Sequence, residues 1–254
     1  MLTWIDDDQT PLPPATQALG PGSDAPGLVA VGGRPSPRRL EEAYRQGIFP
    51  WYSEGQPTLW WSPDPRMVLP VAGLKIAHSL AKTLRRFARS PDCEVRVDTA
   101  FREVIEACAG MPRAGQQGTW ILPEMVEAYC AWQRLGRVHS VETWIDGRLA
   151  GGLYGVAIGG MFFGESMFAH RSDASKIALC ALICLCRAHG VALIDCQQNT
   201  RHLASLGARE MPRRDFLAHV ARMLDEPGIR DWTYDRSLWA QLLDDAPGTQ
   251  EPAA

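Results

Sequence analysis

The chain has 254 residues, of which 46% are hydrophobic and 22% charged, a composition typical of a globular protein with one large domain or two small ones. Its net charge of −3 excludes a nucleic-acid-binding protein that is basic over its whole surface. No apolar run reaches the roughly 18 residues of a membrane-spanning helix, and the acidic first residues lack the apolar core of a secretory signal. Seven scattered cysteines predict reduced thiols, so we expect a cytoplasmic protein that does not enter membranes.

The first part of the chain is rich in proline and glycine. Residues 1–27 predict an extended N-terminal arm, and residues 28–75 predict a small α/β domain. Within this domain, Ser36 and Pro37 form the start signal of a helix that ends near Gly47.

An aromatic and proline-rich stretch follows at residues 47–66, with four prolines and five aromatic residues. Proline excludes a helix and disfavours a central strand, so we predict a rigid segment of turns. Its tryptophans either hold a flat ligand or fill the core, and composition alone favours neither.

Residues 62–90 carry a local excess of positive charge on this acidic protein. Six basic residues against one acid, Asp64, give a net charge of +5. A helix predicted over residues 79–89 places four of the six on one face, where they repel one another by a few tenths of a kcal/mol per pair. That arrangement favours an anionic partner, and the alternative is a solvated face. The six are Arg66, Lys75, Lys82, Arg85, Arg86 and Arg89.

The remainder, residues 76–240, predicts a second and larger domain. A period of two in the hydrophobic pattern indicates an antiparallel meander, which is followed by a long helix and a buried strand. Because that strand follows a helical crossover, we expect it to run parallel to its neighbour. This order predicts an α+β fold with an acetyltransferase-like mixed sheet, and residues 241–254 predict a disordered tail. The predicted strands are residues 67–70, 93–97, 138–145, 149–158, 161–165 and 191–196, and the predicted helices are residues 99–109, 123–135, 174–189 and 215–224.

Polar residues lie at the ends of these predicted strands. Glu165 ends the meander, Ser175 lies in the first turn of the long helix, and Asp195 and Gln197 end the buried strand. An Asp beside an apolar strand is costly unless it is paired, so it makes a structural hydrogen bond or takes part in chemistry. For Glu165 the alternative is a capping or sheet-edge carboxylate. The glycine-rich pyrophosphate loop of coenzyme A enzymes is absent before the helix, and the cysteines lack zinc-ligand spacing, so we expect neither cofactor.

Several strings in this order resemble the leucyl/phenylalanyl-tRNA–protein transferases of bacteria. The most specific are Trp-Trp-Ser-Pro-Asp-Pro-Arg at residues 60–66 and Gly-Glu-Ser-Met-Phe at residues 164–168. The resemblance covers roughly residues 28–235. The matching strings are residues 47–52, 59–66, 118–121, 139–142, 152–157, 163–168, 174–176, 193–197 and 204–208.

The resemblance implies transfer of Leu or Phe, and also Met, from aminoacyl-tRNA to the α-amine of a protein that begins with Arg or Lys. It implies a monomer without metal or cofactor, and an N-terminal α/β domain beside an acetyltransferase-like domain. Asp195 and Gln197 would deprotonate and orient the amine, with Asp195 as the electrostatic driver, and Glu165 would lie beside the donor's amino group. Trp51 and Trp120 would hold the terminal adenosine, although Trp120 alone fits the core equally well.

The same resemblance implies a pocket for the Leu or Phe side chain, lined by Phe162, Met161 and Leu179, with Ser175 as a further contact. Phe163 departs from the pattern because a smaller residue is expected there, so it either faces the other side of the sheet or narrows the pocket. The contacts expected with tRNA are Arg66, Lys82, Arg85, Arg86 and Arg89.

Two other functions fit parts of the sequence. A coenzyme-A-dependent N-acetyltransferase would use the same fold, but the pyrophosphate loop that it needs is missing. A non-catalytic RNA-binding module would use only the basic helix and would form no product.

Overall fold

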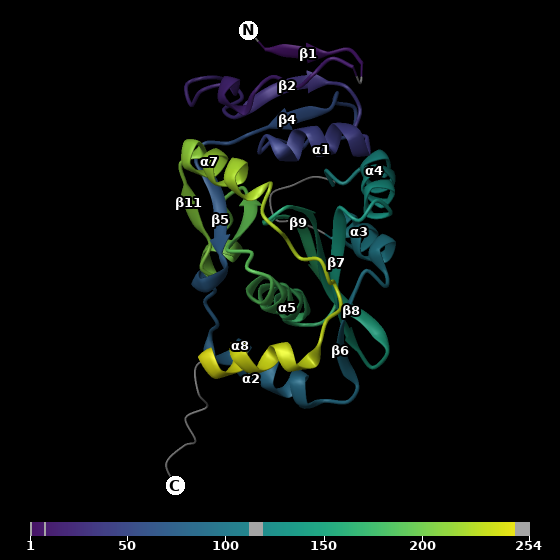
Figure 1. Ribbon diagram of the computed structural model, residues 1–254. Coiled ribbons are helices and arrows are strands. Elements are labelled where there is room, and N and C mark those ends of the chain that lie inside the picture. The colour runs from purple at the N-terminus through teal and green to yellow at the C-terminus, as the bar shows by residue number, and fades with distance from the viewer. Residues whose placement is uncertain (1, 8, 112–118, 247–254) are drawn as a thin grey trace.

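Figure 1 shows the computed structural model of the chain, which describes residues 2–7, 9–111 and 119–246. The chain forms a four-stranded sheet close to the N-terminus and a seven-stranded sheet that carries most of the rest. Gly118 of the motif at residues 118–121, and the predicted disordered tail from residue 247 on, lie outside the described residues. Within the described ranges, no helix is long and apolar enough to cross a membrane.

Each helix predicted from the sequence has a counterpart within a few residues. The predicted helices correspond to α1 to α5 and α7, whereas the sequence pattern did not predict the short helices α6 and α8. The helices are α1 (Pro37–Arg45), α2 (His78–Arg89), α3 (Phe101–Gly110), α4 (Pro123–Gln133), α5 (Ala174–Ala188), α6 (Arg201–Ser205), α7 (Arg213–Met223) and α8 (Trp239–Asp245), with 3-10 turns η1 (Ala15–Gln17), η2 (Val71–Gly73) and η3 (Arg236–Leu238).

The small sheet has the strand order β1-β2-β4-β3, and α1 packs between it and the large sheet (Figure 1). Its strands are β1 (Thr3–Ile5), β2 (Leu28–Gly32), β3 (Phe49–Pro50) and β4 (Leu59–Trp61). The prediction of an extended arm over residues 1–27 is therefore wrong at its start, because β1 pairs in parallel with β2. Two strands also run through the aromatic stretch; prolines flank β4 and occur only in the edge strand β3, as the missing amide N–H requires.

The large sheet has the strand order β11-β5-β10-β9-β8-β7-β6. Its strands are β5 (Arg66–Pro70), β6 (Cys93–Val97), β7 (Val138–Ile145), β8 (Arg148–Ile158), β9 (Met161–Ala169), β10 (Leu193–Gln197) and β11 (Arg209–Met211). Strands β7 to β9 form the predicted antiparallel meander, and β10 runs parallel to β9 as expected. Strand β6 adds a further antiparallel strand beside β7. The meander, the helix α5 and the parallel strand β10 confirm the α+β, acetyltransferase-like fold class.

Strands β9 and β10 separate after a short stretch of pairing. Only Ile194 and Asp195 of β10 pair with β9, opposite Phe162 and Phe163, although β9 continues to Ala169. Polar side chains that follow the paired stretch therefore lie where the two strands part.

Each of these two strands carries an extra residue at this point. Tyr154 and Gly155 of β8 pair with Ser166 and Gly164 of β9, so Glu165 between them is unpaired. In β10 the pairing to β5 shifts between Asp195 and Gln197. Such β-bulges change the direction in which side chains point. Here they affect Glu165 of β9 and Gln197 of β10.

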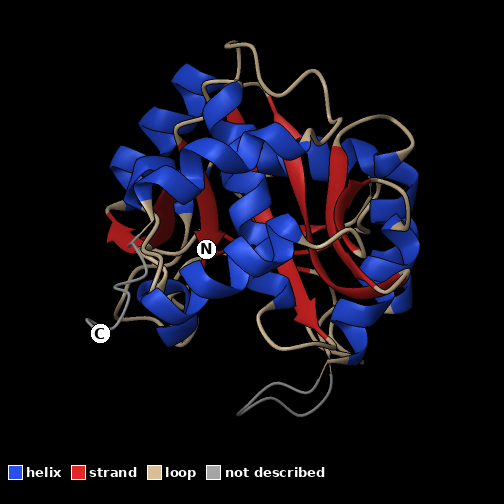
Figure 2. Cartoon of the chain, turned by 90° about the horizontal axis from the view of Figure 1, so that it is seen from below, coloured by secondary structure: helices blue, strands red, loops and turns tan. Residues whose placement is uncertain are grey.

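Helices cover both faces of the large sheet, as the view from below in Figure 2 shows. On one face, α2, α5 and α8 enclose an apolar core with the side chains of β5 and β10. On the other face, α1, α3 and α4 form a core that continues into the small sheet through Trp60 and Tyr52. The small sheet is thus packed against the large one by a shared core.

The domain boundary predicted at residue 75 does not coincide with the division between the sheets. Strand β5 belongs to the large sheet, and β4 is the last strand of the small one, so the division falls between Trp61 and Arg66. The predicted tail is helical up to Asp245 because α8 buries Trp239 and Leu242 against α2 and α5.

Candidate active site

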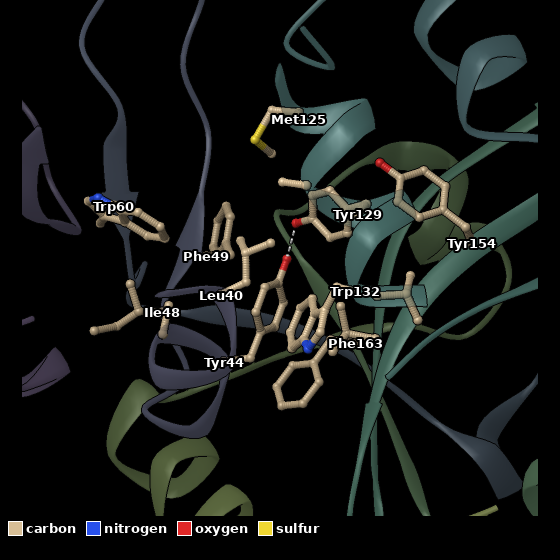
Figure 3. Packing of buried hydrophobic residues seen from close by; sticks show 14 of the residues in the cluster. Leu40, Tyr44, Ile48, Phe49, Trp60, Met125, Tyr129, Trp132, Tyr154 and Phe163 are labelled. Atoms are coloured by element: carbon tan, nitrogen blue, oxygen red, sulfur yellow. Dashed lines mark hydrogen bonds between the residues drawn. The ribbon is translucent and has the colours of Figure 1, made fainter. Parts of the chain in front are cut away.

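The carboxylate of Glu165 lies where the small domain meets the large sheet. Tyr44 of α1 donates its hydroxyl to Glu165 Oε1 at 2.6 Å, and Tyr129 of α4 donates to Oε2 at 3.2 Å. The two hydroxyl oxygens are 2.6 Å apart, as the dashed line in Figure 3 marks. Gln197 Nε2 donates to the same Oε1 at 2.7 Å. Four elements thus meet at a single carboxylate.

Burial controls the ionisation of this group. It raises the pKa of Glu165 from its usual value near 4.5 to about 7, and the charge on Asp195 acts in the same direction. The hydrogen bonds from Tyr44, Tyr129 and Gln197 oppose the rise because they stabilise the ionised form. Burial beside Glu165 also raises the pKa of both tyrosines, so their hydroxyls remain protonated donors.

Asp195 is completely buried and forms an ion pair with Arg66. The guanidinium donates from Nε at 2.8 Å and from Nη2 at 2.6 Å to the two carboxylate oxygens. Its plane lies between the rings of Phe49 and Phe216, 4.7 and 4.6 Å from their centroids. This bidentate pairing keeps a charge stable in the apolar interior.

Asp195 also determines the conformation of the next polar residue. Its Oδ1 accepts the backbone N–H of Gln197 at 2.9 Å, across the bulge. Gln197 has a φ of +61°, a left-handed conformation that costs about 1 kcal/mol or more for a residue with a side chain. The hydrogen bond offsets this cost and directs the Gln197 carboxamide toward Glu165. Since its Nε2 is engaged there, its Oε1 is the acceptor that remains.

The structure brings the three predicted polar residues together but changes their arrangement. Glu165 and Gln197 are in direct contact, while Asp195 reaches only the backbone of Gln197. Tyr44 and Tyr129 were not predicted as site residues. Tyrosines on predicted helices look like core residues, and only the fold shows that Tyr44 meets a carboxylate 121 positions away.

The two predicted adenosine contacts lie on the same side of the large sheet. Trp51 is half-buried, its ring packs edge-on against Trp61, and its carbonyl accepts the Trp61 indole N–H at 2.7 Å. Trp120 is buried within the core that contains Tyr44 and Tyr129. Trp60 fills the same core, so at least one tryptophan of the pair at 60 and 61 is structural, as expected.

The residues predicted to line the side-chain pocket divide between two faces. Phe162 and Leu179 pack in the core of α2, α5 and α8, whereas Met161 packs in the core on the other face. Met161 therefore cannot line one pocket with them, because adjacent strand residues point to opposite faces. Phe163 also faces away from Phe162 and contacts the ring of Tyr44, with centroids 5.3 Å apart. Ser175 is half-buried in the first turn of α5.

Three of the five predicted tRNA contacts are exposed on α2, namely Lys82, Arg86 and Arg89. The prediction for Arg66 is wrong, because its side chain is completely buried against Asp195. Arg85 is half-buried, and its Nη2 donates to the carbonyl oxygens of Leu243 and Ala246 at 3.4 and 3.2 Å. Arg85 therefore supports the C-terminal end of α8 instead of lying free on the basic face.

Replacing Glu165 by Gln should change how stability depends on pH. A folded-state pKa raised from about 4.5 to about 7 stabilises the fold at low pH, and this contribution is lost as pH rises to about 7. The loss amounts to about 3 kcal/mol in the wild type and should be absent in Glu165→Gln. Urea unfolding of both proteins between pH 5 and 8 measures the difference, and equal pH dependence would contradict the raised pKa.

Comparison with known proteins adds the family. A model described as the leucyl/phenylalanyl-tRNA protein transferase matches residues 68–221, and a model of the N-terminal domain of that protein matches residues 33–64. A GCN5-related N-acetyltransferase from Kribbella flavida is a similar structure, with a TM-score of 0.36 and 13% identity over 66% of this chain and 58% of the other.

Curated relatives match over nearly the whole chain. The leucyl/phenylalanyl-tRNA–protein transferase of Methylibium petroleiphilum is 63% identical over 97% of this chain and 94% of its own length. That of Leptothrix cholodnii is 59% identical over the full length of both. The resemblance seen in the sequence is confirmed, and the chain belongs to the leucyl/phenylalanyl-tRNA–protein transferase family.

Proposed function

We propose that the chain transfers Leu, Phe or Met from aminoacyl-tRNA to the α-amine of proteins that begin with Arg or Lys, which marks them for degradation. Membership of the family makes the chain an aminoacyltransferase that uses an aminoacyl-tRNA donor and a protein acceptor. The three donor amino acids and the two acceptor residues belong to the proposal, as do a monomeric state and a location in the cytoplasm. No cofactor is required, since an aminoacyl ester is already activated.

The orientation of Gln197 is the observation that carries the proposal. Its Nε2 donates to Glu165, which fixes the carboxamide so that Oε1 can accept an N–H of the incoming α-amine. Gln197 and Glu165 are buried, with 7% and 8% exposure, so the incoming amine would meet them in a mostly enclosed polar site. Above pH 7 the ionised Glu165 increases the polarity of the amide and strengthens Oε1 as an acceptor.

The reaction requires that the two substrates be oriented toward each other, and it does not require a covalent intermediate with the enzyme. An α-amine has a pKa near 8, so a useful fraction is neutral and nucleophilic at neutral pH. Its nitrogen attacks the ester carbonyl carbon, an amide bond forms, and the bond from that carbon to the ribose oxygen breaks. The amine loses one proton and the ribose oxygen gains one. Gln197 orients the amine but cannot hold this proton, since an amide is not a base at neutral pH.

Asp195 acts as a positioning residue in this scheme. Both of its oxygens accept hydrogen bonds from Arg66, and one also accepts the backbone N–H of Gln197. It therefore acts on the reaction by fixing the bulge that aims Gln197. This role replaces the direct electrostatic one expected from the sequence.

The donor would contact residues from both faces of the large sheet, near the point where β9 and β10 part. Trp51 and Trp120 would stack on the terminal adenosine, which contributes on the order of 1–3 kcal/mol per base. Phe162 and Leu179 would surround the Leu or Phe side chain and reject charged side chains through the cost of desolvation. Ser175 stays a candidate contact with the donor, and the exposed cations that would contact tRNA phosphates are Lys82, Arg86 and Arg89.

A transfer assay tests the proposal. Labelled leucine should pass from Leu-tRNA to peptides that begin with Arg or Lys, and a matched peptide that begins with Ala should remain unlabelled. Equal labelling of the three peptides would contradict the acceptor specificity. Binding of tRNA without any product would instead indicate an RNA-binding module, and thermal stabilisation by acetyl-coenzyme A would indicate an acetyltransferase.

Replacement of Asp195 separates its structural role from its positioning role. Asp195→Ala removes both the ion-pair partner of the buried Arg66 and the acceptor of the Gln197 N–H. It should cost about 3–5 kcal/mol of stability, and should lower kcat more than it changes the KM for Leu-tRNA. The apolar double variant Arg66→Met/Asp195→Leu should regain much of the stability. It should not regain kcat, because Gln197 still lacks the acceptor for its N–H. Recovery of kcat together with stability would show that Asp195 only stabilises the fold.

A further inference from the structure

A second concave site lies beside the helix that carries Tyr44. The cavity has a volume of about 320 Å³ and is bounded by the end of α1, the start of β7, the end of β8 and the segment that follows α7. That segment crosses in front of β7 and β8 on its way to α8 (Figure 1). The volume is at the lower end of the range for ligand pockets, roughly 300–1,000 Å³.

Three arginines from three separate elements line this cavity. They are Arg45 at the end of α1, Arg137 before β7 and Arg230 after α7, and no Asp or Glu is among the lining residues. Glu41 offsets part of the charge, since it accepts from Arg45 at 2.8 Å and lies 3.6 Å from Arg137. Arg230 forms no ion pair or hydrogen bond with the other described residues. The wall therefore has an excess of positive charge, on a chain whose net charge is −3.

The neighbouring acids do not cancel that excess from within the cavity. The segment after α7 contains Asp225, Glu226 and Asp231, and none of them lines the cavity. Asp231 accepts the backbone N–H of Thr233 at 2.8 Å, so its carboxylate stabilises the local turn.

The backbone that forms the cavity is held in place without the arginines. Gly160 donates its N–H to the carbonyl oxygen of Met223 at 2.7 Å, which ties the β8–β9 turn to the end of α7. Gly159 has a φ of +55°, and an added Cβ there would lie 2.5 Å from the same carbonyl oxygen. A Cβ at Gly228 would overlap the carbonyl oxygen of Gly159. Glycine is required for this close approach, so the cavity is a feature of the backbone.

An aromatic pair forms another part of the wall. The rings of His139 and Trp232 are stacked with centroids 3.8 Å apart and planes 11° apart. Asp98 Oδ2 lies 2.6 Å from His139 Nδ1 and fixes the ring. The cavity thus combines a flat, rigid surface with several guanidinium groups.

We propose that this cavity binds a phosphate group, either of the tRNA backbone or of a small phosphorylated compound. Guanidinium groups are matched to phosphate by their planar, multiple N–H donors. The site is separate from the basic face of α2, and it does not depend on the roles proposed for Glu165 and Gln197. Arg45, which lines the cavity, follows Tyr44 on α1, so the cavity lies close to the contact between the small domain and the large sheet. A tRNA bound at the candidate active site would pass beside it.

The test compares a triple variant, Arg45→Ala/Arg137→Ala/Arg230→Ala, with wild type and with Arg214→Ala. Arg214 is a matched control because its side chain is 90% exposed on α7 and lies outside the cavity. Binding of Leu-tRNA is measured over about 50 to 200 mM salt, and binding of pyrophosphate and AMP by calorimetry. All three proteins should have the same Tm, since each replaced side chain is exposed. Binding, and not turnover, is the readout, so loss of catalysis cannot imitate loss of this site.

For a tRNA phosphate, the triple variant should lose tenfold or more in tRNA affinity, and its salt slope should fall by about one for each lost contact. For a small phosphorylated compound, wild type should bind pyrophosphate or AMP, and the triple variant should lose that binding with its tRNA slope unchanged. In both cases Arg214→Ala should behave as wild type. An unchanged salt slope together with unchanged or absent binding of pyrophosphate and AMP would overturn the proposal, as would an equal loss in Arg214→Ala.

Discussion

The carboxylate of Glu165 is buried in an otherwise apolar interface, and a buried charge without partners would cost several kcal/mol. Its partners come from elements far apart in the chain: Tyr44 on α1, Tyr129 on α4 and Gln197 on β10. The fold must bring the small domain against the large sheet to satisfy this one group. The same contacts that join the two parts therefore also define the polar centre of the site.

The ion pair of Arg66 and Asp195 provides a second constraint beside the first. It joins β5 to β10, and through the N–H of Gln197 it holds an unfavourable backbone conformation at the end of β10. Because β9 and β10 part at this point, the bulges in both strands turn Glu165 and Gln197 toward each other. The residues that stabilise this part of the fold thus also fix the orientation of the Gln197 carboxamide.

Periodic segments of the sequence were sufficient to predict most of the large domain. The alternation over residues 138–145 gave β7 with the observed bounds, and the crossover rule gave β10 its parallel direction. Long-range partners were not accessible to such patterns. Arg66 was counted with the basic face because a local charge count cannot detect Asp195, which lies 129 positions further along. The strand β1 was missed because a three-residue strand in a proline-rich region has no periodicity of its own.

In the proposed mechanism, an ionised Glu165, stabilised by Tyr44, orients Gln197 for catalysis. The pH dependence of kcat/KM for transfer to an Arg peptide, compared between wild type and Tyr44→Phe, tests it most directly. Activity should fall as pH drops through the pKa of Glu165, about 7, and the loss of one hydrogen bond to the ionised form should move that midpoint up by roughly 0.5–1 pH unit. The ionisation of the peptide amine is common to both enzymes and cancels in the comparison. A midpoint that does not move, or that moves to lower pH, would show that Tyr44 does not stabilise an ionised Glu165 that activity requires.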